Sequence, residues 1–170
     1  MHKNIYRTSW RRVLAGLIDA LVFLPIGLLN DYLFASERSA PALLIWGTTY
    51  YSSLWLYSVL LHAKYGKTIG KLVMGISVLD ISEQRNPTLR QAFIRDIIYI
   101  LLNVFWLIYF IYLVVAGSYT YGVVERNGPG QVMLWASAGW FVLEILTMLT
   151  NSKRRAIHDF LAGTVVVKDA

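Results

Sequence analysis

The sequence contains no cysteine, and only 15% of its 170 residues are charged. Without cysteine the chain can form neither disulfides nor thiolate metal sites, and it has no thiol nucleophile. A soluble domain carries roughly a quarter charged residues, so this chain has too little charge to cover a water-soluble surface. Hydrophobic residues make up 56% of the chain, and its mean hydropathy is +0.50. These values, with apolar residues gathered in long runs, predict an integral membrane protein.

Four apolar segments are long enough to cross a hydrocarbon core of about 30 Å, which takes about 20 helical residues. They cover residues 13–34, 42–62, 97–116 and 132–150. The first segment contains Asp19 and is followed by no small-residue cleavage pattern, so we expect a retained helix instead of a signal peptide. The sequence therefore predicts one domain over residues 1–170, an all-α membrane protein with a four-transmembrane-helix bundle.

The lysines and arginines are distributed unevenly around these four segments. Fourteen of the sixteen lie in the head, the middle loop (63–96) or the tail (151–170), whereas the first and third loops hold only Arg38 and Arg126. Basic residues are enriched on the cytoplasmic side of membrane proteins. We therefore expect both termini and the middle loop to be cytoplasmic, in a cell membrane.

The middle loop shows the pattern of short structural elements. Thr68 can cap a short amphipathic helix that Gly75 ends, and residues 76–81 alternate as a strand does. Pro87 and Thr88 then mark the start of a helix that continues into the third membrane segment.

The tail repeats this order of elements. Ser152 is the expected cap of a basic helix, Gly163 is its stop, and residues 164–167 are typical of a strand. Because a lone short strand is unstable, the two strands are expected to pair as a small β-ribbon beside interfacial amphipathic helices.

The net charge of +6 bears on the partners of the protein. The basic residues flank apolar runs, which favours anionic lipid headgroups as a partner over nucleic acid. Lys67 and Lys71, at and just before this helix, are expected to meet those headgroups. The three histidines lack metal-ligand spacing, and no motif of a water-accessible active site is present, so we predict no metal, no cofactor and no enzymatic activity.

Three stretches carry a family resemblance. They are Arg-Arg-Val-Leu-Ala-Gly-Leu-Ile-Asp at 11–19, Gly-Lys-Thr-Ile-Gly-Lys at 66–71, and His-Asp-Phe-Leu-Ala-Gly-Thr-Val-Val-Val at 158–167. In this order they resemble the RDD family of membrane proteins, which is named for an arginine and two aspartates. The resemblance implies that Arg12, Asp19 and Asp159 are those residues, and that the protein has three or four spans. Cation/proton antiport and accessory roles in membrane complexes have both been proposed for the family.

Three polar side chains fall inside predicted spans. Asp19 and Asn103 each lie six residues into a span, and Glu144 lies six residues before the end of the last one. This spacing places all three at about the same depth, where a charge costs at least about 2.5–3.5 kcal/mol. Asp19 is expected to meet either Arg95 or Asn103, in the latter case sharing a proton with Glu144.

Charged residues near the span ends offer further pairs. Arg12 points away from Asp19 along their shared helix face, so its expected partner is Asp159 in the tail. Asp159 could instead form only a local helical pair with Arg155, four residues earlier. Such pairs also fix helix register without any role in turnover, so a structural reading of Arg12, Asp19 and Asp159 stays open.

Two functions follow from these patterns. The polar residues within the membrane favour cation/proton antiport with Na⁺, Li⁺ or K⁺, or a related ion-linked transport, for which four spans would require at least a dimer. The elaborate basic loop and tail favour a non-catalytic scaffold or accessory subunit that docks a protein partner on its cytoplasmic face.

Overall fold

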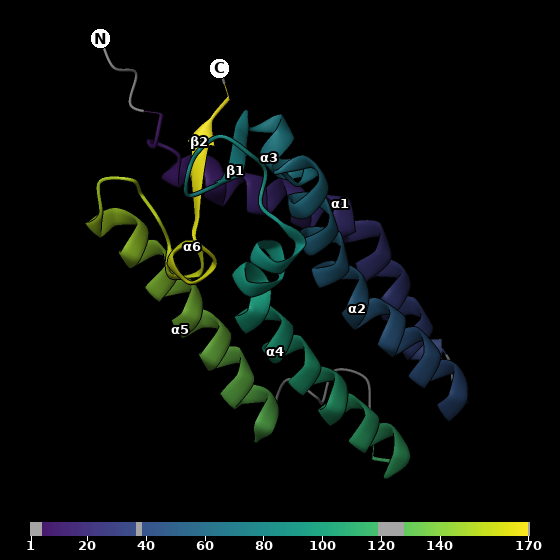
Figure 1. Cartoon of the computed structure of the whole chain (residues 1–170). Coiled ribbons are helices and arrows are strands. Elements are labelled where there is room, and N and C mark those ends of the chain that lie inside the picture. Colours follow the sequence, from purple (N-terminus) through teal and green to yellow (C-terminus); the bar gives the residue numbers. More distant parts are fainter. Residues whose placement is uncertain (1–4, 37–38, 119–127, 170) are drawn as a thin grey trace.

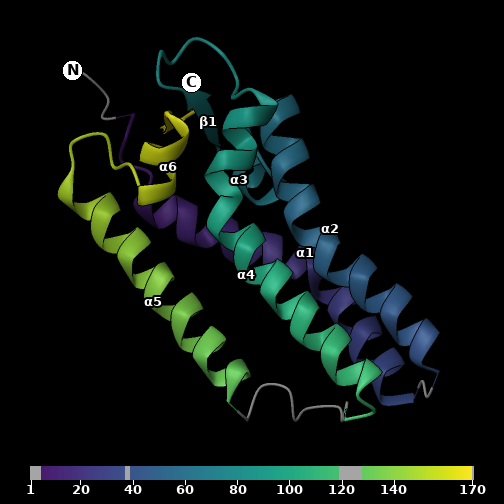
Figure 2. The ribbon, with the colours of Figure 1, turned by 60° about the horizontal axis from the view of Figure 1, so that its bottom comes forward.

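The computed structural model describes residues 5–36, 39–118 and 128–169. In these ranges the chain forms six helices and two strands, and the long helices run side by side away from a small ribbon (Figures 1 and 2). The elements are α1 (Ser9–Ser36), α2 (Ala40–Tyr65), α3 (Ile69–Val73), β1 (Ile76–Asp80), α4 (Leu89–Val115), α5 (Pro129–Thr150), α6 (Ile157–Ala162) and β2 (Thr164–Lys168). Arg38 and Arg126, which bear on orientation, lie outside the described residues.

Three of the described helices, α1, α4 and α5, are long and apolar enough to cross a membrane. Helix α1 is continuous through Pro25. Helix α2 has sufficient length at 26 residues, but its middle carries hydroxyl side chains, including Thr48, Thr49 and Ser53. A membrane protein with three such helices is therefore established, and a fourth span is not.

Helix α2 packs along α4 through two clusters. Phe34 of α1 joins Leu43 and Phe110 in the first, where a Cβ on Gly47 would lie 2.3 Å from the Phe110 ring. The second holds Val59, Ala92 and Ile100 nearer the ribbon. The tight fit at Gly47 fixes the α2–α4 crossing, because a larger residue there would push the helices apart.

The β-ribbon is confirmed. Strands β1 and β2 are antiparallel, with Ile76 opposite Lys168 and Asp80 opposite Thr164. Ile76 and Val78 are fully buried against Ala15 of α1, which attaches the ribbon to one end of the bundle. We call this the ribbon end; it also carries α3 and α6 (Figure 1).

Most of the expected helix boundaries are confirmed. Thr68 caps α3, and Thr88 begins α4 with a reciprocal bond to Gln91. Gly163 ends α6 with a φ of 63°, a conformation that glycine adopts without strain. The predicted cap Ser152 is wrong: α6 begins at Ile157, where the backbone N–H of Ala156 donates to Asp159.

Candidate functional site

Asp159 is the centre of a charge network at the ribbon end. Its side chain is fully buried. The carboxylate accepts a hydrogen bond from Arg12 Nη1 of α1 at 2.6 Å and another from Arg95 Nη1 of α4. Burial alone would raise the pKa of Asp159, but the charges of Arg12 and Arg95 outweigh burial and hold it below its usual range. The carboxylate therefore stays ionised and joins three helices.

The expected pairing of Arg12 with Asp159 is present, whereas a local Arg155–Asp159 side-chain pair is not. Arg155 donates instead to two backbone carbonyls, those of Asp159 at 2.8 Å and Thr164 at 2.9 Å. Its guanidinium therefore links α6, which contains Asp159, to β2, which begins at Thr164.

Asp19 forms a separate site. Its carboxylate accepts hydrogen bonds from the Tyr57 hydroxyl and the Thr68 hydroxyl, both at 2.7 Å, and from the Gly70 backbone N–H at 2.8 Å. A Cβ on Gly70 would lie 2.0 Å from the backbone oxygen of Ala15, so α3 approaches α1 as closely as glycine allows. Asp19 therefore anchors α3 to α1.

The predicted partners of Asp19 are wrong. Arg95 pairs with Asp159, and Asn103 donates to the Tyr99 carbonyl of its own helix at 2.8 Å. Glu144 contacts a histidine instead of sharing a proton with Asp19. The physical reason is that the segment 66–71 packs against α1. Its neutral donors, the Thr68 hydroxyl and the Gly70 backbone N–H, occupy the Asp19 carboxylate in place of the expected partners.

Glu144 of α5 is 3% exposed, and its Oε2 is in direct contact with Nδ1 of His158 in α6. The other ring nitrogen, Nε2, lies 2.9 Å from Arg95 Nη2. A guanidinium can only donate, so Nε2 must accept, and a neutral His158 then carries its proton on Nδ1, facing Glu144. An unbroken chain of polar contacts thus runs from Glu144 through His158 and Arg95 to Asp159.

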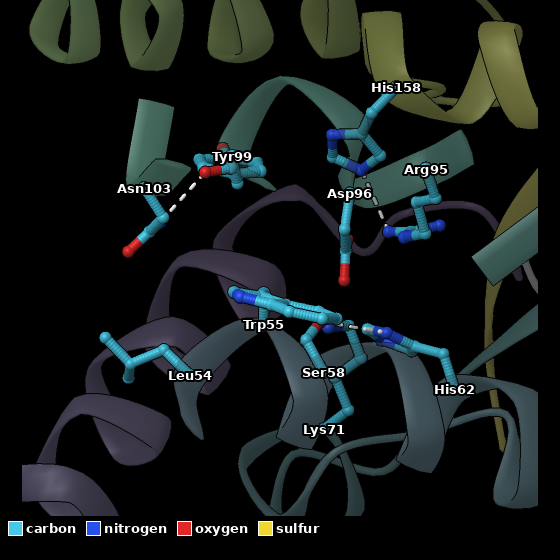
Figure 3. A pocket seen from close by; sticks show the side chains of 10 residues that line it. All are labelled: Leu54, Trp55, Ser58, His62, Lys71, Arg95, Asp96, Tyr99, Asn103 and His158. Carbon is cyan, nitrogen blue, oxygen red and sulfur yellow. Dashed lines mark hydrogen bonds between the residues drawn. The ribbon is translucent and has the colours of Figure 1, made fainter. Parts of the chain in front are cut away.

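Three cavities among the described residues lie near these side chains, and two of them are lined by Arg95 and His158. The largest, about 370 Å³, lies between α2 and α4 (Figure 3), and two others of about 320 and 200 Å³ adjoin Asp19 and Glu144. Lys71 of α3 lines all three. Burial lowers the pKa of Lys71 to about 8, with a further lowering by the charge of Arg95.

Lys71 thus faces the cavities, whereas the expected contact of Lys67 and Lys71 with headgroups stays a prediction. The sequence offered no direct signal for the position of Lys71, which lies between Gly70 and Leu72. From the sequence, His158 is considered only among the histidines without metal-ligand spacing, and neither Tyr57 nor Asp96 is singled out.

No group of three or more metal-ligating side chains occurs among the described residues. Two buried carboxylate oxygens, Glu144 Oε1 and Asp96 Oδ2, have no hydrogen-bond partner in the described part of the chain. These oxygens are available to a proton, a monovalent cation or an ammonium group.

Comparison with known proteins agrees with the sequence resemblance. Neither a curated protein nor a solved structure matches the chain. The model of the RDD family matches residues 6–163, nearly the whole chain, and within that match Arg12, Asp19 and Asp159 occupy the buried contacts described above. The protein is therefore a membrane-embedded member of the RDD family.

Proposed function

We propose that the protein is an ion-linked membrane protein that exchanges protons for a monovalent cation, Na⁺, Li⁺ or K⁺, at the Glu144–His158 pair. The observation that supports this proposal is a carboxylate buried within an apolar helix, with one oxygen on a histidine and the other without a partner in the described residues. A carboxylate in such a place is costly unless it is protonated or paired.

Glu144 is better placed than Asp19 to bind the proton or the monovalent cation. The Asp19 carboxylate already accepts three hydrogen bonds that hold α3 in place. Glu144 Oε1 is free of hydrogen bonds within the described residues and borders a cavity of about 200 Å³. Proton exchange with His158 needs no rearrangement, because the two side chains are already in contact.

The membrane arrangement belongs to the same proposal. We place α2 as a fourth span, since it runs alongside α1 and α4 (Figure 2), and put both termini in the cytoplasm by the excess of basic residues there. We also propose a bacterial cell membrane, the usual location of the family that the chain resembles. The ribbon end is then cytoplasmic and contacts anionic headgroups. A dimer or larger homo-oligomer is also proposed, since Trp135 and Phe141 on α5 are more than half exposed.

The test is flux in liposomes that contain a pH-sensitive dye, with Na⁺, Li⁺ or K⁺ added outside. Wild type is expected to move protons when the cation is added, and Glu144→Gln is expected to lose that movement. Asp31→Asn, which neutralises an exposed carboxylate of α1, is the matched control and should retain it. Equal proton movement in wild type and empty liposomes, with correctly inserted protein, would overturn the proposal.

An accessory or scaffold role is the second candidate, supported by exposed apolar side chains outside the long helices. Leu72 and Val73 of α3 and Phe160 and Leu161 of α6 are at least half exposed. These side chains suit either the membrane interface or a docked protein. Loss of a crosslinked partner on mutation of these residues, with Glu144→Gln unaffected, would favour this role over transport.

A further inference from the structure

The cavity between α2 and α4 changes in polarity along its length. At the ribbon end its walls carry His62, Lys71, Arg95, Asp96 and His158 (Figure 3). Leu54 and Asn103 line it eight residues further along α2 and α4, which is about 12 Å at 1.5 Å per residue. A charged end and a less polar end within one cavity match an amphiphilic ligand.

The charged end offers donors to an anion. Lys71 forms no ion pair within the described chain, although Asp19 and Asp96 line the same cavities. His62 is 2% exposed, and its Nε2 has no hydrogen-bond partner among the residues described. Burying these groups beside Arg95 is unfavourable unless an anion joins them, and phosphate oxygens are their usual acceptors.

The same end also offers an acceptor. Asp96 is 7% exposed, and its Oδ2 is without a hydrogen bond from any described residue. A carboxylate would repel a simple phosphate, but it would attract an ammonium group carried by the same ligand. The lining therefore suits a group that has both charges.

We propose that this cavity binds a phosphate ester that bears a primary ammonium, the phosphoethanolamine group, with Lys71 and His62 on the phosphate and Asp96 on the ammonium. A cavity of about 370 Å³ has room for such a group. In a membrane the group is supplied by phosphatidylethanolamine, and in solution by free phosphoethanolamine. Phosphatidylethanolamine has no net charge, so its binding adds none to the network, although Arg95 and His158 line the cavity as well.

The test is calorimetric titration of the full-length protein in detergent with short-chain phosphatidylethanolamine and short-chain phosphatidylcholine. Phosphatidylcholine keeps the phosphate but replaces the primary ammonium with a methylated one that cannot donate hydrogen bonds. Wild type is expected to bind phosphatidylethanolamine about tenfold more tightly, the value of one charge-assisted hydrogen bond.

Two variants separate the role of Asp96, on the ammonium, from that of Lys71, on the phosphate. Asp96→Asn is expected to remove the preference between the two lipids, with Asp31→Asn as the matched control. Lys71→Met is expected to weaken both lipids about tenfold, since it removes a phosphate contact, and Lys64→Met, which removes an exposed lysine, should change neither.

These measurements test the binding site and identify the source of its ligand. Tight binding of the lipid but not of soluble phosphoethanolamine assigns the site to a membrane lipid, and equal binding assigns it to the soluble group. Equal affinity of wild type for the two lipids, or a preference that survives in a folded Asp96→Asn protein, would overturn the proposal. Loss of proton flux in the Glu144→Gln protein would not alter either result.

Discussion

Arg12 and Asp159 lie 147 residues apart in the sequence, and their side chains meet at 2.6 Å where the Asp159 side chain is fully buried. Arg95 reaches the same carboxylate from α4, so one aspartate joins the first helix, the third long helix and the tail. This arrangement makes Asp159 the residue on which the assembly of the ribbon end depends.

Removing one partner of this cluster should be severe. Arg12→Gln or Asp159→Asn is expected to lower the free energy of unfolding by about 3–5 kcal/mol, because each leaves an uncompensated buried charge. The double variant should lose less than the sum of the two. Denaturant unfolding in detergent measures this. Arg85→Gln, which removes an exposed arginine from its pair with Asp80, is the control and should cost less than about 1 kcal/mol, because Asp80 keeps its hydrogen bonds from Ser82 and Gln91.

The contact between α3 and α1 should tolerate no side chain at Gly70. Gly70→Ala would bring Cβ to 2.0 Å from the Ala15 carbonyl oxygen, and a loss of about 1–3 kcal/mol is expected. Gly139→Ala on α5 meets nothing within 4 Å, so it should be neutral or stabilising by up to about 1 kcal/mol. Similar melting temperatures for the two variants would contradict the close packing.

The caps of α3 and α4 and the end of α6 show what the sequence predicts well. Thr68 and Thr88, followed by apolar spacing, indicate helix starts because their hydroxyls satisfy backbone N–H groups locally, and Gly163 indicates a stop by its left-handed backbone. The long apolar runs likewise predict α1, α4 and α5. These features depend on neighbours within a few residues, and such neighbours are visible in the sequence.

The contacts across the bundle could not be predicted in the same way. Spacing places Asp19 and Glu144 at similar depths, but it does not give the rotation of each helix about its axis. Asp19 faces the buried turn at Thr68, whereas Glu144 faces His158 of α6. Arg12 with Asp159 was predictable because few acids are available near that end of the first span.

Lys71 gives a pH dependence of stability with a definite sign. Its pKa falls to about 8 in the folded protein, below the ordinary value of 10.5, so the unfolded chain binds more protons between these two values. Stability should therefore rise with pH between about 8 and 10.5. Thermal unfolding in lipid-free detergent should show this rise in wild type, and Lys71→Met should remove it. A rise of the same size in both proteins would exclude Lys71 as its source.

Asp159 makes the stability of the folded protein depend on pH in the acid range. Its folded pKa is depressed, so the stability it contributes is complete above the ordinary carboxyl pKa and is lost as pH falls below about 4. Unfolding of wild type in denaturant at decreasing pH should show this loss. Asp159→Asn, already destabilised at neutral pH, should show a smaller dependence; an unchanged acid dependence would assign the loss to other carboxylates.

The tautomer of His158 tests the geometry of the proton pair. Nitrogen chemical shifts of labelled histidine should show an unprotonated Nε2 and a protonated Nδ1, because Arg95 occupies Nε2 as a donor. The signal is assigned by its loss in His158→Gln. A ring protonated at Nε2 in the neutral form would mean that Arg95 does not donate to it.

The central claim is that Glu144 with His158 exchanges a proton for a monovalent cation, and proton release on cation binding tests it most directly. Purified protein in weakly buffered detergent with a pH-sensitive dye would be mixed with Na⁺, Li⁺ or K⁺ at matched ionic strength. Wild type and Asp31→Asn should release about one proton per chain, and Glu144→Gln should release none. No release from wild type with any of the three cations, or undiminished release from a folded Glu144→Gln protein, would contradict the claim.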